Sequence, residues 1–116
     1  METNIVDLTG RIGHELELKK AKTGASYLNF SLATEEVWTD KEGVEKSSTD
    51  WHRISCWGKL AENCSQHLKK GNMVQVLGKL RTKSWEEEGE KKFATMVEAR
   101  EIDFLEEDDA RPKKKQ

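Results

Sequence analysis

The chain has 116 residues, of which 34% are hydrophobic and 36% charged, with 20 Lys and Arg against 22 Asp and Glu. This length fits one domain with a small core, and no stretch reaches the roughly eighteen consecutive apolar residues that a membrane span needs. Residues 1–4 do not resemble the start of a secretory leader, and Cys56 and Cys64 form no Cys-x-x-Cys pair, so we expect a cytoplasmic protein with reduced thiols.

The first predicted strand covers residues 5–18, because apolar side chains recur along it on either side of Gly10 and Gly13. Glycines inside a strand indicate a bend or bulge, which a tightly curved sheet requires. After a turn at residues 22–24, alternating apolar and polar side chains predict a second strand over residues 28–38.

The third predicted strand, residues 51–57, follows a hairpin or longer loop at residues 40–43. Alternation places His52, Ile54 and Cys56 on one side, and we expect Ile54 and Cys56 to face the core. The opposite side carries four residues, which are Trp51, Arg53, Ser55 and Trp57.

The apolar period changes to that of a short helix over residues 59–70, and Gly71 is the expected stop. A long strand follows. Its expected core face carries Val74, Val76, Gly78 and Leu80, and its other face carries Lys79, Arg81, Lys83 and Trp85. An acidic turn at residues 86–90 leads into a last strand over residues 93–104.

The predicted order of elements is three strands, one helix and two strands. Five strands with one helix between the third and the fourth is the arrangement of an oligonucleotide-binding (OB) barrel, an all-β fold. We expect this domain to cover residues 1–105. Residues 106–116 hold four acids, then four bases and the only proline, and they predict a charged, disordered tail.

Cations and indoles are sorted onto two strand faces, although the net charge of -2 by itself argues against a polyanionic partner. Arg53, Lys79, Arg81 and Lys83 can follow a phosphate backbone, and indoles offer stacking surfaces to unpaired bases, at roughly 1–3 kcal/mol per base. Stacking needs only the π-face of a base, so the pattern predicts binding of single-stranded DNA without sequence preference. The alternative is that the indoles pack in the core or in a dimer interface. It is disfavoured because a buried Trp85 would draw Lys79, Arg81 and Lys83 inside with it.

Six segments of the chain are similar to one known family, in order and in spacing, over roughly residues 4–105. They are residues 10–13, 29–34, 51–54, 57–62, 68–71 and 78–85. These segments resemble the bacterial-type single-stranded DNA-binding proteins (SSB). The resemblance implies an OB fold, usually a homotetramer with a dimer as the other possibility, that coats single-stranded DNA in replication, recombination and repair.

The resemblance also implies functional residues. Four tryptophans fall where the family has base-stacking aromatics: Trp38, Trp51, Trp57 and Trp85. Six cations match basic positions along its DNA path: Lys19, Arg53, Lys59, Lys70, Arg81 and Lys83. His52 matches a histidine at the family's subunit interface, which implies a role in oligomer assembly.

Two departures from the family pattern concern the tail and the first strand. Members usually continue into a linker rich in Gly, Pro and Gln and an acidic tip that recruits repair proteins, whereas this sequence ends at Gln116 with neither. We therefore expect no such recruitment by this chain, whether it is a truncated form or a phage, plasmid or accessory paralogue. Glu15-Leu16 replaces a common Asp-Pro, which bears on the bend of the first strand.

The charges of the tail have other interpretations. Its acids could bind divalent ions or compete with DNA for the basic groove, and its lysines could contact phosphate. A solvated tail is favoured, because a run of like charges is usually solvated.

No pattern for catalysis or metal binding is present. The sequence has no Ser/His/Asp or Cys/His arrangement and no Gly-rich phosphate loop, so we expect a non-enzyme without a cofactor. Cys56, Cys64 and His67 match no zinc spacing, and buried thiols are expected instead of metal ligands. An RNA-binding OB module and an adaptor subunit that binds proteins through its Trp faces are alternatives. The adaptor is disfavoured because protein interfaces tend to shed lysine.

Overall fold

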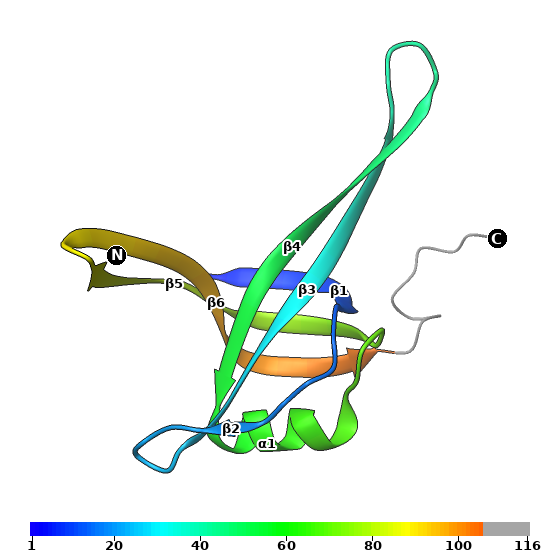
Figure 1. Ribbon diagram of the computed structural model, residues 1–116. Coiled ribbons are helices and arrows are strands. Elements are labelled where there is room, and N and C mark those ends of the chain that lie inside the picture. The colour runs from blue at the N-terminus through cyan, green and yellow to red at the C-terminus, as the bar shows by residue number, and fades with distance from the viewer. Residues whose placement is uncertain (106–116) are drawn as a thin grey trace.

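The computed structural model describes residues 1–105, in which six strands and one helix follow one another (Figure 1). They are β1 (Val6–Ile12), β2 (Lys19–Lys20), β3 (Ser26–Thr39), β4 (Glu45–Trp57), α1 (Gly58–His67), β5 (Met73–Glu87) and β6 (Glu90–Leu105). The sheet order is β1-β5-β6-β4-β3-β2, and an additional pairing of β1 with β3 closes five strands into a barrel. Among the strands of residues 1–105, only β4 and β6 pair in parallel. Helix α1 connects the third and the fourth barrel strand, as predicted.

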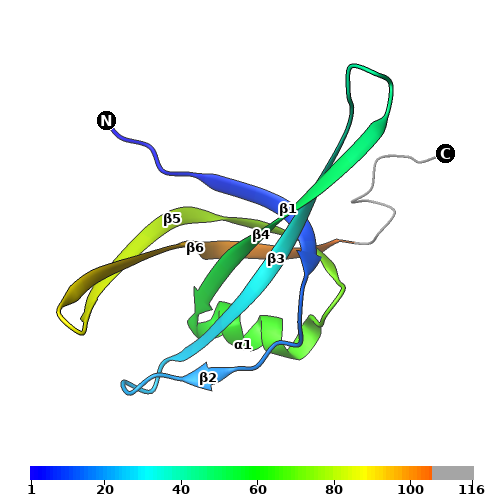
Figure 2. The same ribbon diagram turned by 45° about the horizontal axis from the view of Figure 1, so that its top comes forward.

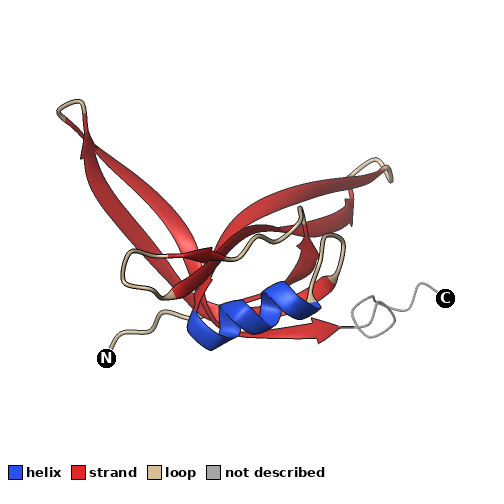
Figure 3. Ribbon diagram, turned by 60° about the horizontal axis from the view of Figure 1, so that its bottom comes forward, coloured by secondary structure: helices blue, strands red, loops and turns tan. Residues whose placement is uncertain are grey.

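Alternate side chains of the barrel strands fill the core together with one face of α1, which lies across one end of the barrel (Figure 3). The core residues are Ile12, Leu28, Phe30, Leu32, Ile54, Cys56, Ala61, Cys64, Leu68, Val74, Val76, Val97 and Ala99. The predicted inward positions Ile54, Cys56, Val74 and Val76 are therefore confirmed.

The first predicted strand is wrong in its length. β1 ends at Ile12, and the chain forms no further strand until Lys19. Just after the end of β1, a side chain replaces a backbone acceptor opposite β3: the Ser31 N–H donates to His14 Nε2 at 3.2 Å. Leu16 still packs against the core, which explains its place in the apolar pattern.

Two long hairpins, β3–β4 and β5–β6, extend from the barrel in different directions (Figures 1 and 2). β4 begins at Glu45, six residues before the predicted start. The prediction missed residues 45–50 because they are all polar and show no hydrophobic alternation. The Asp40 carboxylate closes this hairpin by accepting hydrogen bonds from the N–H groups of Glu42 and Val44, both at 2.9 Å. Apolar periodicity therefore cannot predict hairpin strands that are polar on both faces, because such strands have no buried face.

The prediction that Leu80 lies in the core is wrong, since its side chain is 49% exposed. The register of β5 with β6 shifts at Leu77/Gly78, and β1 pairs with β5 only as far as Gly78. Leu80 therefore has no β1 residue beside it, although Val97 opposite it in β6 still pairs with β4. Ser55 lies on the outward side of β4, as predicted. It is nevertheless only 5% exposed, because β6 pairs beside it.

No helix within residues 1–105 is long and apolar enough to cross a membrane. The predicted tail, residues 106–116, lies outside the described residues.

Candidate nucleic-acid interface

Four neighbouring strands present one continuous outward surface, because residues directly opposite each other in a sheet point to the same side. Asn29 pairs with Ser55, Ser55 with Glu98, and Glu98 with Lys79, so this row crosses from β3 through β4 and β6 to β5. We call this surface the outer face. By the same registers it includes Tyr27, Asn29, Ser31 and Ala33 of β3, Trp51, Arg53, Ser55 and Trp57 of β4, Lys92, Ala94, Met96 and Glu98 of β6, and Lys79, Arg81, Lys83 and Trp85 of β5.

The two strand faces that the sequence singled out thus belong to the same surface, but they are not adjacent. β6 runs between β4 and β5 and adds Met96 and Glu98 to the surface. Sequence reasoning missed both residues. The alternation of Val97 and Ala99 toward the core could have indicated that Glu98 points outward.

Trp57 lies at the end of β4 and is 43% exposed. Its indole stacks on the ring of Tyr27, with ring centroids 5.0 Å apart and an angle of 30° between the planes. Lys19 of β2 pairs with Tyr27 on the other side, so Lys19, Tyr27 and Trp57 form one row across three strands. Tyr27 was not singled out from the sequence, although it alternates with the core residue Leu28.

Trp51 is the most exposed of the four tryptophans, at 61%. Its six-membered ring lies against the backbone of Gly13, where a Cβ atom would be only 2.4 Å from a ring carbon. A glycine is therefore needed at residue 13 for the indole to take this position, and any larger residue would displace it.

Trp38 and Trp85 lie on the two hairpins. Trp85 is 45% exposed, and its Nε1–H donates to Glu87 Oε1 at 3.4 Å. Trp38 is 43% exposed, but it alternates in phase with the core residues of β3 and so faces the opposite side of the β3–β4 hairpin from Trp51. None of the four indoles lies in the core of this chain, and they do not all share one surface.

Most of the predicted cations lie on or beside the outer face. Arg53, Lys79 and Lys83 are exposed and make no ion pair within the described part of the chain. Arg81 is different, because its guanidinium lies 3.2 Å from Glu98 Oε1, with both side chains partly exposed. Such a pair contributes less than about 1 kcal/mol to stability. The structure places the two remaining predicted cations away from the outer face, with Lys59 in the first turn of α1 and Lys70 beyond the end of the helix.

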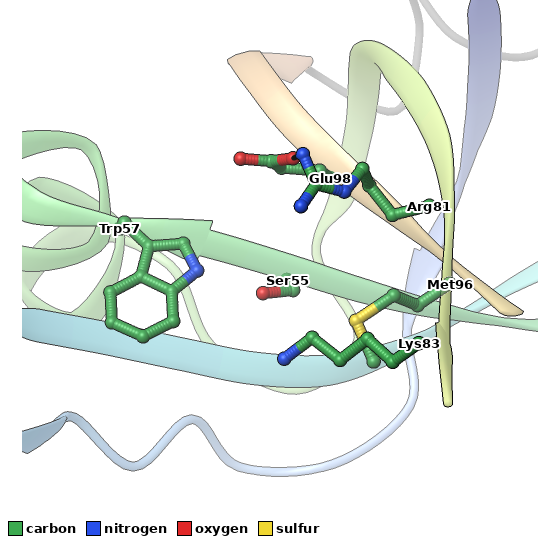
Figure 4. A pocket seen from close by; sticks show the side chains of 6 residues that line it. All are labelled: Ser55, Trp57, Arg81, Lys83, Met96 and Glu98. Carbon is green, nitrogen blue, oxygen red and sulfur yellow. Dashed lines mark ion pairs between the residues drawn. The ribbon is translucent and has the colours of Figure 1, made fainter. Parts of the chain in front are cut away.

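A pocket of about 270 Å³ opens in the outer face between β4 and the β5–β6 hairpin (Figure 4). Its lining residues are Ser55, Trp57, Arg81, Lys83, Met96 and Glu98. Three of these were predicted to bind DNA, and they come together here from strands β4 and β5.

His52 and the two thiols lie on the inward side of the sheet and of α1. His52 is half-buried, with its Nε2 2.9 Å from Thr34 Oγ1. Cys56 and Cys64 are buried, as predicted, and both are free thiols in the structure. A hydrogen bond with Cys64, together with burial, raises the pKa of Cys56 above its usual value, so this thiol is protonated at neutral pH. Residues 1–105 contain no group of three or more His, Cys, Asp or Glu that could hold a metal ion.

Comparison with known proteins identifies the family. Residues 3–105 match the model of the "Single-strand binding protein family". The chain belongs to this family. The predicted resemblance to SSB proteins is therefore confirmed.

Among its relatives, the family member named "Single-stranded DNA-binding protein 1" of Chlorobaculum tepidum is 43% identical over 104 residues, which is 88% of this chain and 64% of the relative. Thus the chain covers less than two thirds of that relative's length.

The backbone of the present chain is similar to that of the Plasmodium falciparum SSB solved in complex with single-stranded DNA. The TM-score is 0.81 at 33% identity, and the match covers 91% of this chain and 97% of that one.

A second solved structure, the wild-type single-stranded DNA-binding protein from Thermus aquaticus, gives a TM-score of 0.79 at 33% identity and covers 90% of this chain and 51% of that one. These SSB structures agree with the observed barrel. The predicted OB fold is therefore confirmed.

Proposed function

We propose that residues 1–105 bind single-stranded DNA without sequence preference and without catalysis. The observation that carries this proposal is the outer face, on which exposed indoles from β4 and β5 lie among cations, three of which make no ion pair with any residue in the range 1–105. Bases can stack on the indoles while phosphates approach Arg53, Lys79 and Lys83. Family membership and the similarity to an SSB solved with single-stranded DNA support the same assignment.

The position of Trp38 constrains the path of the bound strand. Because Trp38 and Trp51 face opposite sides of the β3–β4 hairpin, a strand that stacks on both has to pass around that hairpin. The exposed Lys19 extends the path beyond Trp57, and Lys59 and Lys70 extend it along α1. The proposed role is that of the family, in which the protein coats single-stranded DNA during replication, recombination and repair at the nucleoid.

Assembly is the second part of the proposal. As in the family, we infer a homo-oligomer, a tetramer or a dimer, with His52 at the contact between subunits. Light scattering of the wild type and of His52→Ala, with and without oligo(dT), tests this inference. A wild type that stays monomeric under both conditions would contradict it.

Titration with oligo(dT) tests the binding function through the intrinsic fluorescence of the tryptophans. We expect quenching by single-stranded DNA, little quenching by duplex DNA of the same length, and weaker binding as the salt concentration rises. The double variant Trp51→Ala with Trp85→Ala should bind at least about ten-fold more weakly, because each lost stack is worth about 1 kcal/mol or more. An unquenched wild type, or tighter binding of a matched RNA oligomer, would argue against the proposal.

A further inference from the structure

Asn4 binds the start of the β5–β6 hairpin through two hydrogen bonds of its side chain. Its Nδ2 group donates to the Leu80 carbonyl oxygen, and its Oδ1 accepts from the Leu80 N–H, both at 2.9 Å. In the ladder of β1 with β5, Val6 pairs with Gly78. The same register, continued past the start of β1, places Asn4 opposite Leu80. The amide of Asn4 therefore takes the place of a backbone partner on this edge of β5.

These two bonds lie where the hairpin loses its other neighbouring strands. In the described part of the chain, β5 pairs with β1 only as far as Gly78, and β6 pairs with β4 no further toward the hairpin than Val97. Val97 lies opposite Leu80 and pairs with Ile54 of β4 on its other side. The pair Leu80–Val97 is thus attached to the barrel through β4 on one edge and through Asn4 on the other.

Beyond this pair the hairpin carries part of the outer face, namely Arg81, Lys83 and Trp85. Figure 1 shows the hairpin projecting away from the barrel. Trp85 is five residues past Leu80, which at about 3.3 Å per residue corresponds to about 17 Å. A rotation of about 10°, which lies within the variation of twist between neighbouring strands, moves a group at that distance by about 3 Å. Such a shift separates an indole from a stacked base, because carbon atoms pack at about 3.5–4.0 Å.

We propose that Asn4 is a positioning residue of the β5–β6 hairpin. Its amide sets the direction in which the hairpin leaves the barrel, and so it places Lys83 and Trp85 on the path of the bound strand. This inference rests on the proposed binding of single-stranded DNA. It gives Asn4 a role that it exerts through the hairpin, without a DNA contact of its own.

Hydrogen exchange tests the contact of Asn4 with Leu80 in the absence of DNA. Alternate N–H groups of an antiparallel strand point to the same edge, so the Thr82 N–H points to the side of β5 on which Leu80 meets Asn4. No described strand pairs with that edge beyond Gly78, which makes Thr82 the internal reference. After correction for intrinsic rates, the Leu80 amide should exchange about ten-fold more slowly than the Thr82 amide in the wild type, and equally fast in Asn4→Ala. Equal exchange of the two amides in the wild type would overturn the inference.

Affinity for oligo(dT) tests the consequence for binding. Asn4→Ala should raise the dissociation constant about three- to five-fold at one fixed salt concentration, because the distal stack and phosphate contact of the hairpin are partly lost. In a background of Lys83→Ala with Trp85→Ala the factor should fall below about two-fold, since the displaced groups are already absent. In a Trp51→Ala background it should keep its full size, because Trp51 lies on β4.

A control variant and two contrary outcomes complete the experiment. Thr3 precedes Asn4 and is exposed, so Thr3→Ala should keep the wild-type affinity and the slow exchange of the Leu80 amide. Thermal melting checks that every variant is folded. An equal loss of affinity in both backgrounds, or wild-type affinity of Asn4→Ala, would overturn the inference. Failure of the wild type to bind oligo(dT) would instead refute the proposed function, while the exchange of the Leu80 amide still decides whether Asn4 holds the hairpin.

Discussion

Substitution of Gly13 by alanine should weaken binding of single-stranded DNA without unfolding the protein. The new Cβ atom would lie 2.4 Å from a ring carbon of Trp51 and 3.1 Å from a second one. Carbon atoms pack at about 3.5–4.0 Å, so the indole has to move by at least about 1 Å. Trp51 is 61% exposed and can move outward. The cost to the free energy of unfolding should therefore stay below about 1 kcal/mol.

The effect on binding should be larger than the effect on stability. A base stack is worth about 1–3 kcal/mol, and a displaced indole loses a good part of this energy. We expect Gly13→Ala to raise the dissociation constant for oligo(dT) about five- to ten-fold. The assay is a fluorescence anisotropy titration with labelled oligo(dT) at one fixed salt concentration, because affinity depends on salt.

A double-mutant cycle with Trp51→Ala shows whether Gly13 acts through Trp51. If it does, Gly13→Ala should add nothing to the loss caused by Trp51→Ala, because the affected side chain is already absent. Two independent losses that add in the double variant would refute the reasoning. Wild-type affinity of Gly13→Ala would do the same. Thermal melting of all four proteins checks that each is folded.

Three further predictions concern stability. Val76→Ala should lower the free energy of unfolding in urea by about 2 kcal/mol or more, whereas Leu80→Ala should cost less than about 1 kcal/mol, because only Val76 is buried; equal losses would contradict the exposure of Leu80. Gly78→Ala should abolish folding or lower the melting temperature strongly, since its Cβ would overlap a backbone oxygen of β6; a wild-type melting curve would exclude this contact. The raised pKa of Cys56, caused by its hydrogen bond with Cys64 and by burial, means that folding favours the protonated thiol. The contribution of Cys56 to the free energy of unfolding is complete below the usual pKa of 9.0. Above that pH it should fall by up to about 1.4 kcal/mol per pH unit. A Cys56→Ala variant that shows the same fall would argue against this origin.

Polar strands and exposed hydrophobic residues mark where prediction from the sequence failed. Residues 45–50 form half of a hairpin that is solvated on both faces, so no hydrophobic alternation distinguishes them from a loop. Leu80 keeps the phase of the core residues, but the pairing of β5 with β1 has ended by this point. Alternation reports which side of a strand a residue occupies, and it does not report whether anything covers that side.

The binding surface shows the same division. The identity and spacing of Trp51, Arg53 and Arg81 were enough to predict an outward face with indoles and cations. That prediction needed only the period of two of a strand, which is a local property. The inclusion of Glu98 depended on which strands are neighbours, because the parallel pairing of β4 with β6 places Glu98 beside Ser55.

The sequence by itself therefore determined the barrel interior, the helix between the third and fourth barrel strands, the family, and the residue types of the outward strands, because each of these follows from local period, composition or ordered motifs. The tertiary structure decided what lies between those strands. Closure of the barrel inserted β6 and its carboxylate between two basic strands and set Trp57 against Tyr27. These contacts join residues that are far apart in the chain, so no short-range pattern in the sequence could predict them.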